Sequence, residues 1–102
     1  MKAKPDILKL ERERIEWSLR AFPEATAQSS LEKLRDEADE IEKSLVDAPD
    51  PIEYADALMC LFDSAYRAGI TPEKIFEAFE TKLAINKKRN WKKNPNNSYS
   101  HI

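Results

Sequence analysis

Apolar residues recur at helical spacing through four stretches of the chain, and no stretch shows the alternation typical of a strand. Pro23 ends the first helical stretch, and the other stretches are separated by further proline, glycine or capping residues. The predicted helices cover, in chain order, residues 6–22, 29–46, 50–68 and 71–89. We therefore expect an all-α fold, most simply an antiparallel four-helix bundle.

Capping residues mark the starts of these helices. Asp6 is predicted to cap the first helix, and Ser29 with Glu32 predicts a capping box for the second. Asp50 followed by Pro51 is typical of an N-cap with proline at the first helical position. Gly69 is predicted to follow the third helix, since glycine is favoured just past a helix end.

The third helix is apolar around most of its circumference, unlike the second, which has a single apolar stripe. Its strongly polar residues fall on one narrow strip: Glu53, Asp56, Asp63 and Arg67. A solvated helix face would be wider and would include lysine. The pattern predicts a helix surrounded by protein, with carboxylates that need a cationic partner.

Two further carboxylates lie beside the apolar stripe of the second helix, Glu37 and Glu40. If the second and third helices turn near Pro49, residue 40 lies roughly level with residues 57–59. Glu37, Glu40, Glu53 and Asp56 then converge. Four carboxylates cannot all stay ionised without counter-charge, and a hard divalent cation supplies it, Mg²⁺ first and Mn²⁺ as the alternative.

The fourth helix carries polar and basic residues where its inward apolar line would continue. Ile75 and Phe79 define that line, and Lys82, Asn86 and Arg89 extend it. Beside a carboxylate–metal cluster, this lysine and arginine are predicted to bind phosphate oxygens. The alternative is a helix C-terminus whose basic residues complement the helix dipole.

Composition narrows the function classes. A single glycine in 102 residues argues against hairpins and glycine-rich phosphate loops, and a net charge of −2 makes nucleic acid an unlikely partner. The single cysteine, Cys60, predicts a reducing compartment, and no membrane span or signal peptide is expected, so the predicted location is the cytoplasm. We expect one domain over residues 1–91 and a polar, loosely held tail over residues 92–102.

Glu37-x-x-Glu40, a twelve-residue spacer and Glu53-x-x-Asp56 resemble the metal signature of the MazG-like all-α nucleoside triphosphate pyrophosphohydrolases. The segments "EYADALMCLFDSAYRAGITPE" and "KLAINKKRNW" are most similar to the phage Eaa-type branch of this superfamily, which includes dATP/dGTP diphosphohydrolases. The resemblance spans about residues 16–91.

The resemblance implies Mg²⁺-dependent hydrolysis of a deoxynucleoside triphosphate, dATP or dGTP, to the monophosphate and pyrophosphate. It implies that Glu37, Glu40, Glu53 and Asp56 hold the metal and activate water, and that the substrate is bound by Lys82, Asn86 and Arg89. It also implies a homodimer or homotetramer with helices packed across subunits, encoded by a phage and acting in host cytoplasm.

Several residues have two interpretations. Asp63 contacts the metal or substrate, or forms a salt bridge with Arg67 at i+4. Trp17 and Trp91 stack on a base or pack at a subunit interface. Cys60 is expected to be a small buried apolar side chain. The function also keeps two alternatives: hydrolysis of another nucleotide (dUTP, dCTP or a damaged base), or a catalytically silent helical module that binds nucleotide or protein.

Overall fold

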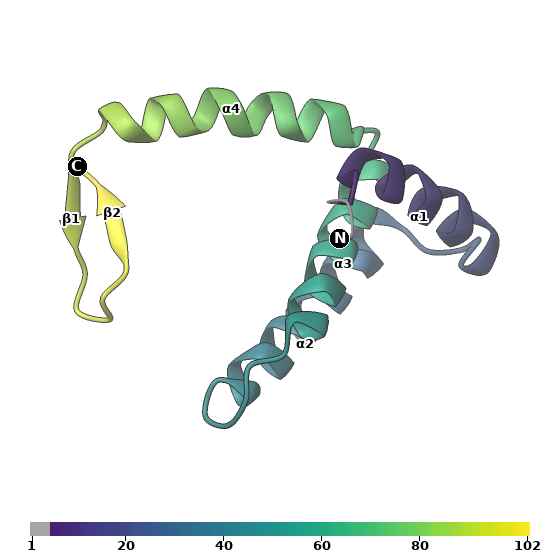
Figure 1. The fold of residues 1–102 in the computed structure, drawn as a ribbon, viewed down its shortest axis with the longest axis horizontal. Helices are drawn as coiled ribbons and strands as arrows, with labels where there is room; N and C mark the ends of the chain where they lie inside the picture. Colours follow the sequence, from purple (N-terminus) through teal and green to yellow (C-terminus); the bar gives the residue numbers. More distant parts are fainter. Residues whose placement is uncertain (1–4) are drawn as a thin grey trace. The chain divides into compact units, whose positions relative to one another are not determined.

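The computed structural model describes residues 5–102, which form four α-helices followed by a two-stranded hairpin (Figure 1). Residues up to Pro72 make one compact unit and residues 73–102 make a second. The elements are α1 (Ile7–Ala21), α2 (Ala27–Ser44), α3 (Pro51–Arg67), α4 (Pro72–Lys88), β1 (Trp91–Lys93) and β2 (Tyr99–His101). The prediction of four helices is confirmed.

Two of the predicted N-caps form as expected. The Asp6 carboxylate accepts hydrogen bonds from the backbone N–H groups of Leu8 and Lys9, at 3.1 and 3.2 Å. The Asp50 carboxylate accepts from the N–H of Ile52 at 2.9 Å, with proline at the next position. Each cap satisfies N–H groups that have no partner inside the helix.

The predicted cap of α2 was wrong by three residues. Thr26 is the N-cap, and its side chain accepts from the N–H of Ser29 at 3.0 Å. Ser29 in turn accepts from the N–H of Thr26 at 2.9 Å. Serine takes the part that glutamate has in the usual capping box, so Ser29 is the third helical residue rather than the cap.

Helices α2 and α3 lie side by side and run antiparallel (Figure 1). Near one end of the pair, Ser64 Oγ donates to the backbone oxygen of Ala27 at 2.8 Å, and Ser30 Oγ donates to Asp63 at 2.6 Å. Helix α1 packs against α3 in the same unit. Among the described residues, the large apolar side chains that are buried are Ile15 of α1 and Phe62 of α3.

Helix α3 ends in a Schellman motif. Gly69 has a φ of +91°, its N–H donates to the backbone oxygen of Tyr66, and the N–H of Ile70 donates to that of Ala65, both at 2.9 Å. The positive φ explains the glycine, because side chains with a Cβ rarely adopt it. The prediction that Gly69 follows the helix is confirmed.

The expectation of a tail without strands was wrong. Strands β1 and β2 pair antiparallel, with Trp91 opposite His101. Asn97 adopts a φ of +70° in the turn, and the N–H of Asn94 donates to the backbone oxygen of Ser98 at 2.7 Å. Asparagine tolerates the left-handed region, so this hairpin forms without the glycine that the prediction required.

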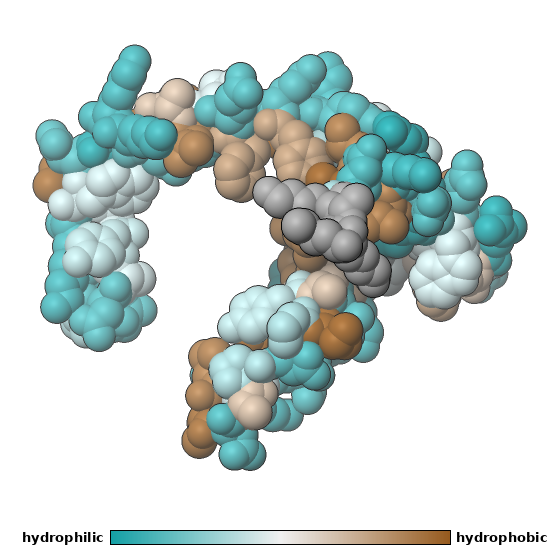
Figure 2. Space-filling view, viewed as in Figure 1, coloured by the Kyte–Doolittle hydropathy of each residue, from teal (hydrophilic) through white to brown (hydrophobic). Residues whose placement is uncertain are grey.

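Many large apolar side chains are exposed in the single chain, and Figure 2 shows brown, apolar groups at the surface, including along α4. Leu58 and Leu61 of α3 are exposed by 44% and 49%, so this helix is not surrounded by its own chain. No helix in residues 5–102 is both long and apolar enough to span a bilayer. The predicted domain limit after residue 91 stays a prediction.

Candidate metal and nucleotide site

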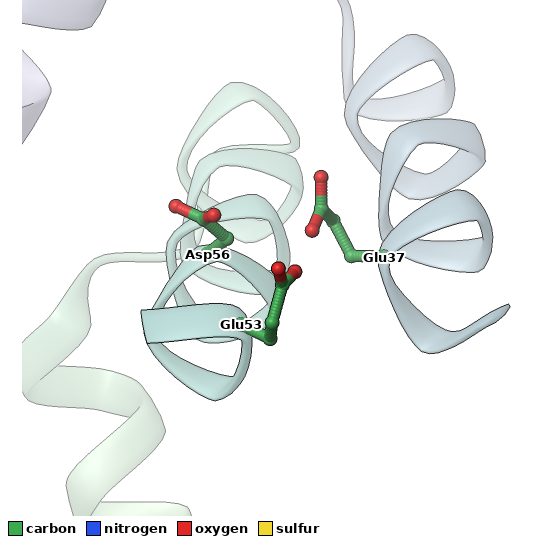
Figure 3. Close-up of side chains that lie close together, drawn as sticks. All are labelled: Glu37, Glu53 and Asp56. Carbon is green, nitrogen blue, oxygen red and sulfur yellow. The ribbon is translucent and has the colours of Figure 1, made fainter. Parts of the chain in front are cut away.

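Three predicted carboxylates converge between α2 and α3. Glu37 comes from α2, Glu53 and Asp56 come from successive turns of α3, and one oxygen from each lies within 4.8 Å of the others (Figure 3). We call these residues the carboxylate triad. Glu37 is buried, Glu53 is half-buried and Asp56 is exposed. The N-cap at Asp50 fixes where α3 begins and so places Glu53 and Asp56 on the face toward α2.

The triad concentrates negative charge. Burial raises the pKa of Glu53, and the negative charges of Glu37 and Asp56 raise it further. Lys33 forms an ion pair with the triad, since its Nζ lies 3.1 Å from Glu37 Oε1. The donor set is all oxygen and carries more negative charge than that lysine balances. Such a set suits a hard divalent ion such as Mg²⁺ or Mn²⁺.

Glu40 lies outside the triad. Its side chain is 57% exposed and pairs with Lys43 Nζ at 3.4 Å. The register between the helices explains this position: Glu37 lies opposite Glu53 and Asp56, so Glu40, about one turn further along α2, lies opposite the first turn of α3. The prediction that residue 40 is level with residues 57–59 was wrong.

A pocket of about 590 Å³ opens beside the triad within the first unit. Glu37 and Asp56 form part of its wall, and Trp17, Phe22 and Met59 supply apolar surface. The rings of Trp17 and Phe22 meet edge to face with centroids 5.2 Å apart, and Trp17 remains 54% exposed. The volume of the pocket is in the range of small-molecule sites, and its wall combines carboxylates with aromatic surface.

Asp63 holds the three helices of this unit together beside the pocket. Its carboxylate accepts hydrogen bonds from the serines of two helices and from two arginines, at distances from 2.6 to 2.9 Å: Ser18, Ser30, Arg14 and Arg67. Burial acts to raise its pKa, but these hydrogen bonds outweigh burial and hold the pKa well below its usual range. Of the two interpretations of Asp63, the salt bridge with Arg67 is confirmed.

The other partners of Asp63 were not found from the sequence. Arg14 is held by Glu11 as well as by Asp63, and both Arg14 and Ser18 come from α1. The sequence did offer one signal. Glu11, Arg14 and Ser18 are spaced so that they fall on one face of α1, where they interrupt its apolar face. Nothing local indicates that these residues meet residue 63.

The predicted phosphate-binding residues belong to the second unit. Lys82 and Asn86 lie on one side of α4, given their spacing, and Arg89 follows directly after the last residue of that helix. Asn86 Oδ1 is buried without a hydrogen-bond partner among the described residues, and the Asn86 backbone oxygen accepts from Trp91 Nε1 at 3.0 Å. Their part in the site, and that of Trp91, stays a prediction.

Comparison with known proteins identifies the family. The family described as dATP/dGTP pyrophosphohydrolase matches residues 10–101. The chain belongs to this family. A dATP/dGTP diphosphohydrolase of cyanophage S-2L is 32% identical over 96 residues, which cover 94% of this chain and 88% of that protein. The predicted resemblance is confirmed.

Other relatives of this dATP/dGTP pyrophosphohydrolase family member are longer. A dATP/dGTP diphosphohydrolase of Salmonella phage PMBT28 is 34% identical over 84% of the chain, and the Eaa protein of Salmonella phage P22 is 38% identical over 85%. The aligned segments make up 28% and 26% of those two proteins, so the chain spans about a quarter of their length.

A solved structure shares the fold. The cyanophage S-2L MazG-like pyrophosphohydrolase, bound to dGDP and three catalytic Mn²⁺ ions per active site, superposes with a TM-score of 0.78 at 30% identity. The match covers 97% of this chain and 99% of that one. The family member therefore has a mostly helical MazG-like fold.

Proposed function

We propose that this chain hydrolyses a deoxynucleoside triphosphate, dATP or dGTP, to the monophosphate and pyrophosphate. The observation that carries the proposal is the carboxylate triad beside the pocket, in a chain whose relatives bear the name dATP/dGTP diphosphohydrolase. The site would act in the cytoplasm of a bacterial host, where its substrate is made.

In this proposal Glu37, Glu53 and Asp56 hold Mg²⁺ or Mn²⁺ through carboxylate oxygens. When bound, the ion supplies positive charge for the phosphate oxygens and activation of a water for attack at the α-phosphorus. Glu40 joins the triad by releasing Lys43, because an exposed pair of this kind contributes little stability.

The remaining residues bind the substrate. The exposed ring of Trp17, with Phe22 beside it, provides an apolar surface for the base or sugar on the pocket wall. The phosphates or sugar are contacted by Lys82, Asn86 and Arg89. Trp91 helps to position Asn86, because Trp91 Nε1 donates a hydrogen bond to the Asn86 backbone oxygen. Asp63 already accepts hydrogen bonds from four side chains, so it keeps a structural role rather than contacting substrate.

The exposed apolar surface of α3 supports a homodimer or homotetramer as the working form. A single chain buries few of its large apolar side chains, and the apolar groups of α3 would be covered by a second copy.

The test is a chromatographic assay of dATP, dGTP, dCTP, dTTP and dUTP with Mg²⁺ or Mn²⁺. We expect monophosphate and pyrophosphate from a preferred purine nucleotide. Asp56→Asn and Glu53→Gln should lose more activity than the roughly 10- to 100-fold that loss of a group supporting a metal ligand costs. Glu40→Gln tests whether the fourth carboxylate takes part.

Asp39→Asn is the matched control, since Asp39 is an exposed carboxylate of α2 outside the triad. It should keep full activity, and circular dichroism should show all variants folded. No turnover of any nucleotide, or near-full activity of Asp56→Asn, would reject the proposal and favour a silent binding module. Turnover of a pyrimidine nucleotide alone would keep the reaction and change the substrate.

A further inference from the structure

Lys33 occupies a special position beside the triad. It lies one turn before Glu37 on α2, its ammonium is 3.1 Å from Glu37 Oε1, and its side chain is 62% exposed. Lys33 also lines the pocket together with Glu37 and Asp56. The one carboxylate that it pairs with is therefore a predicted metal ligand.

This pair is easily broken. Glu37 is buried but the lysine is exposed, so water screens the ammonium, and the long lysine side chain loses freedom when it pairs; both effects limit what this i, i+4 pair contributes. A divalent ion bound by three carboxylates competes with a single ammonium for the same oxygen. If Glu37 held such an ion, the Lys33 ammonium would lose this partner and stay beside the pocket on a flexible stem.

The other cationic side chain on the pocket wall is differently placed. Arg14 is only 9% exposed, and its guanidinium is already bound by Glu11 and by Asp63. It therefore has few donors left for a ligand. Of the two cations that line this pocket, Lys33 is the one that can move to an incoming anion.

Resting on the proposed function, we propose that Lys33 binds a phosphate oxygen of the nucleotide and is held by Glu37 until a divalent ion takes that carboxylate. The residue then has two successive partners. It balances part of the triad's charge in the metal-free protein and adds a charge-assisted hydrogen bond to the substrate in the loaded site. This assigns a phosphate contact to α2, in addition to the predicted contacts from α4.

The test compares Lys33→Met with Lys9→Met in the full chain. Lys9 is a suitable control because it is an exposed lysine of α1 that does not line the pocket. Mn²⁺ binding without nucleotide is followed by electron paramagnetic resonance. Binding of α,β-imido dGTP, which this reaction cannot cleave, is followed by calorimetry with Mn²⁺ present.

We expect Lys33→Met to bind Mn²⁺ about two- to fivefold more tightly than Lys9→Met, because a competing cation is gone. It should bind the nucleotide analogue about tenfold more weakly, and Lys33→Arg should restore that binding. If Lys33→Met matches Lys9→Met in either measurement, the proposal is overturned.

A separate variant distinguishes this result from failure of the proposed function. Glu53→Gln should weaken Mn²⁺ binding whatever Lys33 does, because it removes a triad carboxylate. If Glu53→Gln leaves Mn²⁺ binding unchanged, the metal site itself is wrong and both proposals fall. If Glu53→Gln weakens it while the two lysine variants agree, only the role of Lys33 is rejected.

Discussion

Asp63 shows how much one carboxylate can do in a small helical unit. It accepts hydrogen bonds from α1, α2 and α3, and its side chain is 14% exposed. The sequence indicated only the partner one turn away, Arg67, because i, i+4 neighbours follow from helix geometry alone. The contacts with Arg14, Ser18 and Ser30 required the packing of three helices.

We expect Asp63→Asn to destabilise the fold by about 3 kcal/mol, since it leaves two buried arginines without their shared counter-charge. Urea unfolding followed by circular dichroism measures this change. Asp39→Asn, an exposed carboxylate of α2, should stay within about 0.5 kcal/mol of the original chain. An Asp63 variant as stable as this control would show that the network contributes little.

The same carboxylate predicts a pH dependence. Its pKa in the folded chain is lowered from an ordinary value of 3.8, so its stabilising effect is complete above about pH 5 and is lost progressively as pH falls below that value. The free energy of unfolding should therefore fall more steeply between about pH 4.5 and 2.5 in the original chain than in Asp63→Asn. Equal slopes for the two proteins would contradict the lowered pKa.

At the scale of elements, helix ends were the most predictable features. The caps at Asp6 and Asp50 and the glycine after α3 all formed as expected, because each depends on residues within a few positions of one another. Thr26 was not predicted as the N-cap of α2, because Ser29 and Glu32 match the usual capping-box sequence. The capping box that forms pairs Thr26 with Ser29 instead. The hairpin was missed because an asparagine supplied the positive φ.

Gly69→Ala tests the end of α3. A Cβ at this position meets nothing within 4 Å, so the cost comes from the backbone conformation alone. We expect a loss of about 1 kcal/mol in the free energy of unfolding. Gly69→Asn should lose less, since asparagine adopts positive φ more readily. Equal losses for both variants would point to a cause other than φ, and thermal or urea unfolding measures them.

At the scale of the whole molecule, the main feature is exposed apolar surface. The apolar pattern of α3 could be read from the sequence, but what covers that helix could not. Helix α3 was predicted to be surrounded by protein, yet in the single chain several of its large apolar residues are exposed. We propose that a second copy of the chain covers this surface.

Analytical ultracentrifugation tests whether the chain forms an oligomer that covers this surface. We expect a species larger than a monomer, and we expect Leu61→Glu to shift it toward smaller species because a charge at an apolar interface is costly. Val46→Glu is the control, because Val46 lies in the α2–α3 loop and is already 91% exposed. A monomer at all protein concentrations would reject the oligomer.

The sequence by itself determined the four helices and most of their ends, and it predicted four carboxylates as metal ligands. Periodicity, capping and motif spacing are local, so they can be read without knowing the packing. Tertiary structure decided which residues meet. The register of α2 and α3 brought Glu37 to Glu53 and Asp56 and left Glu40 outside, and three helices together made the pocket and the partners of Asp63. Such contacts join distant positions, and loop geometry and packing set them.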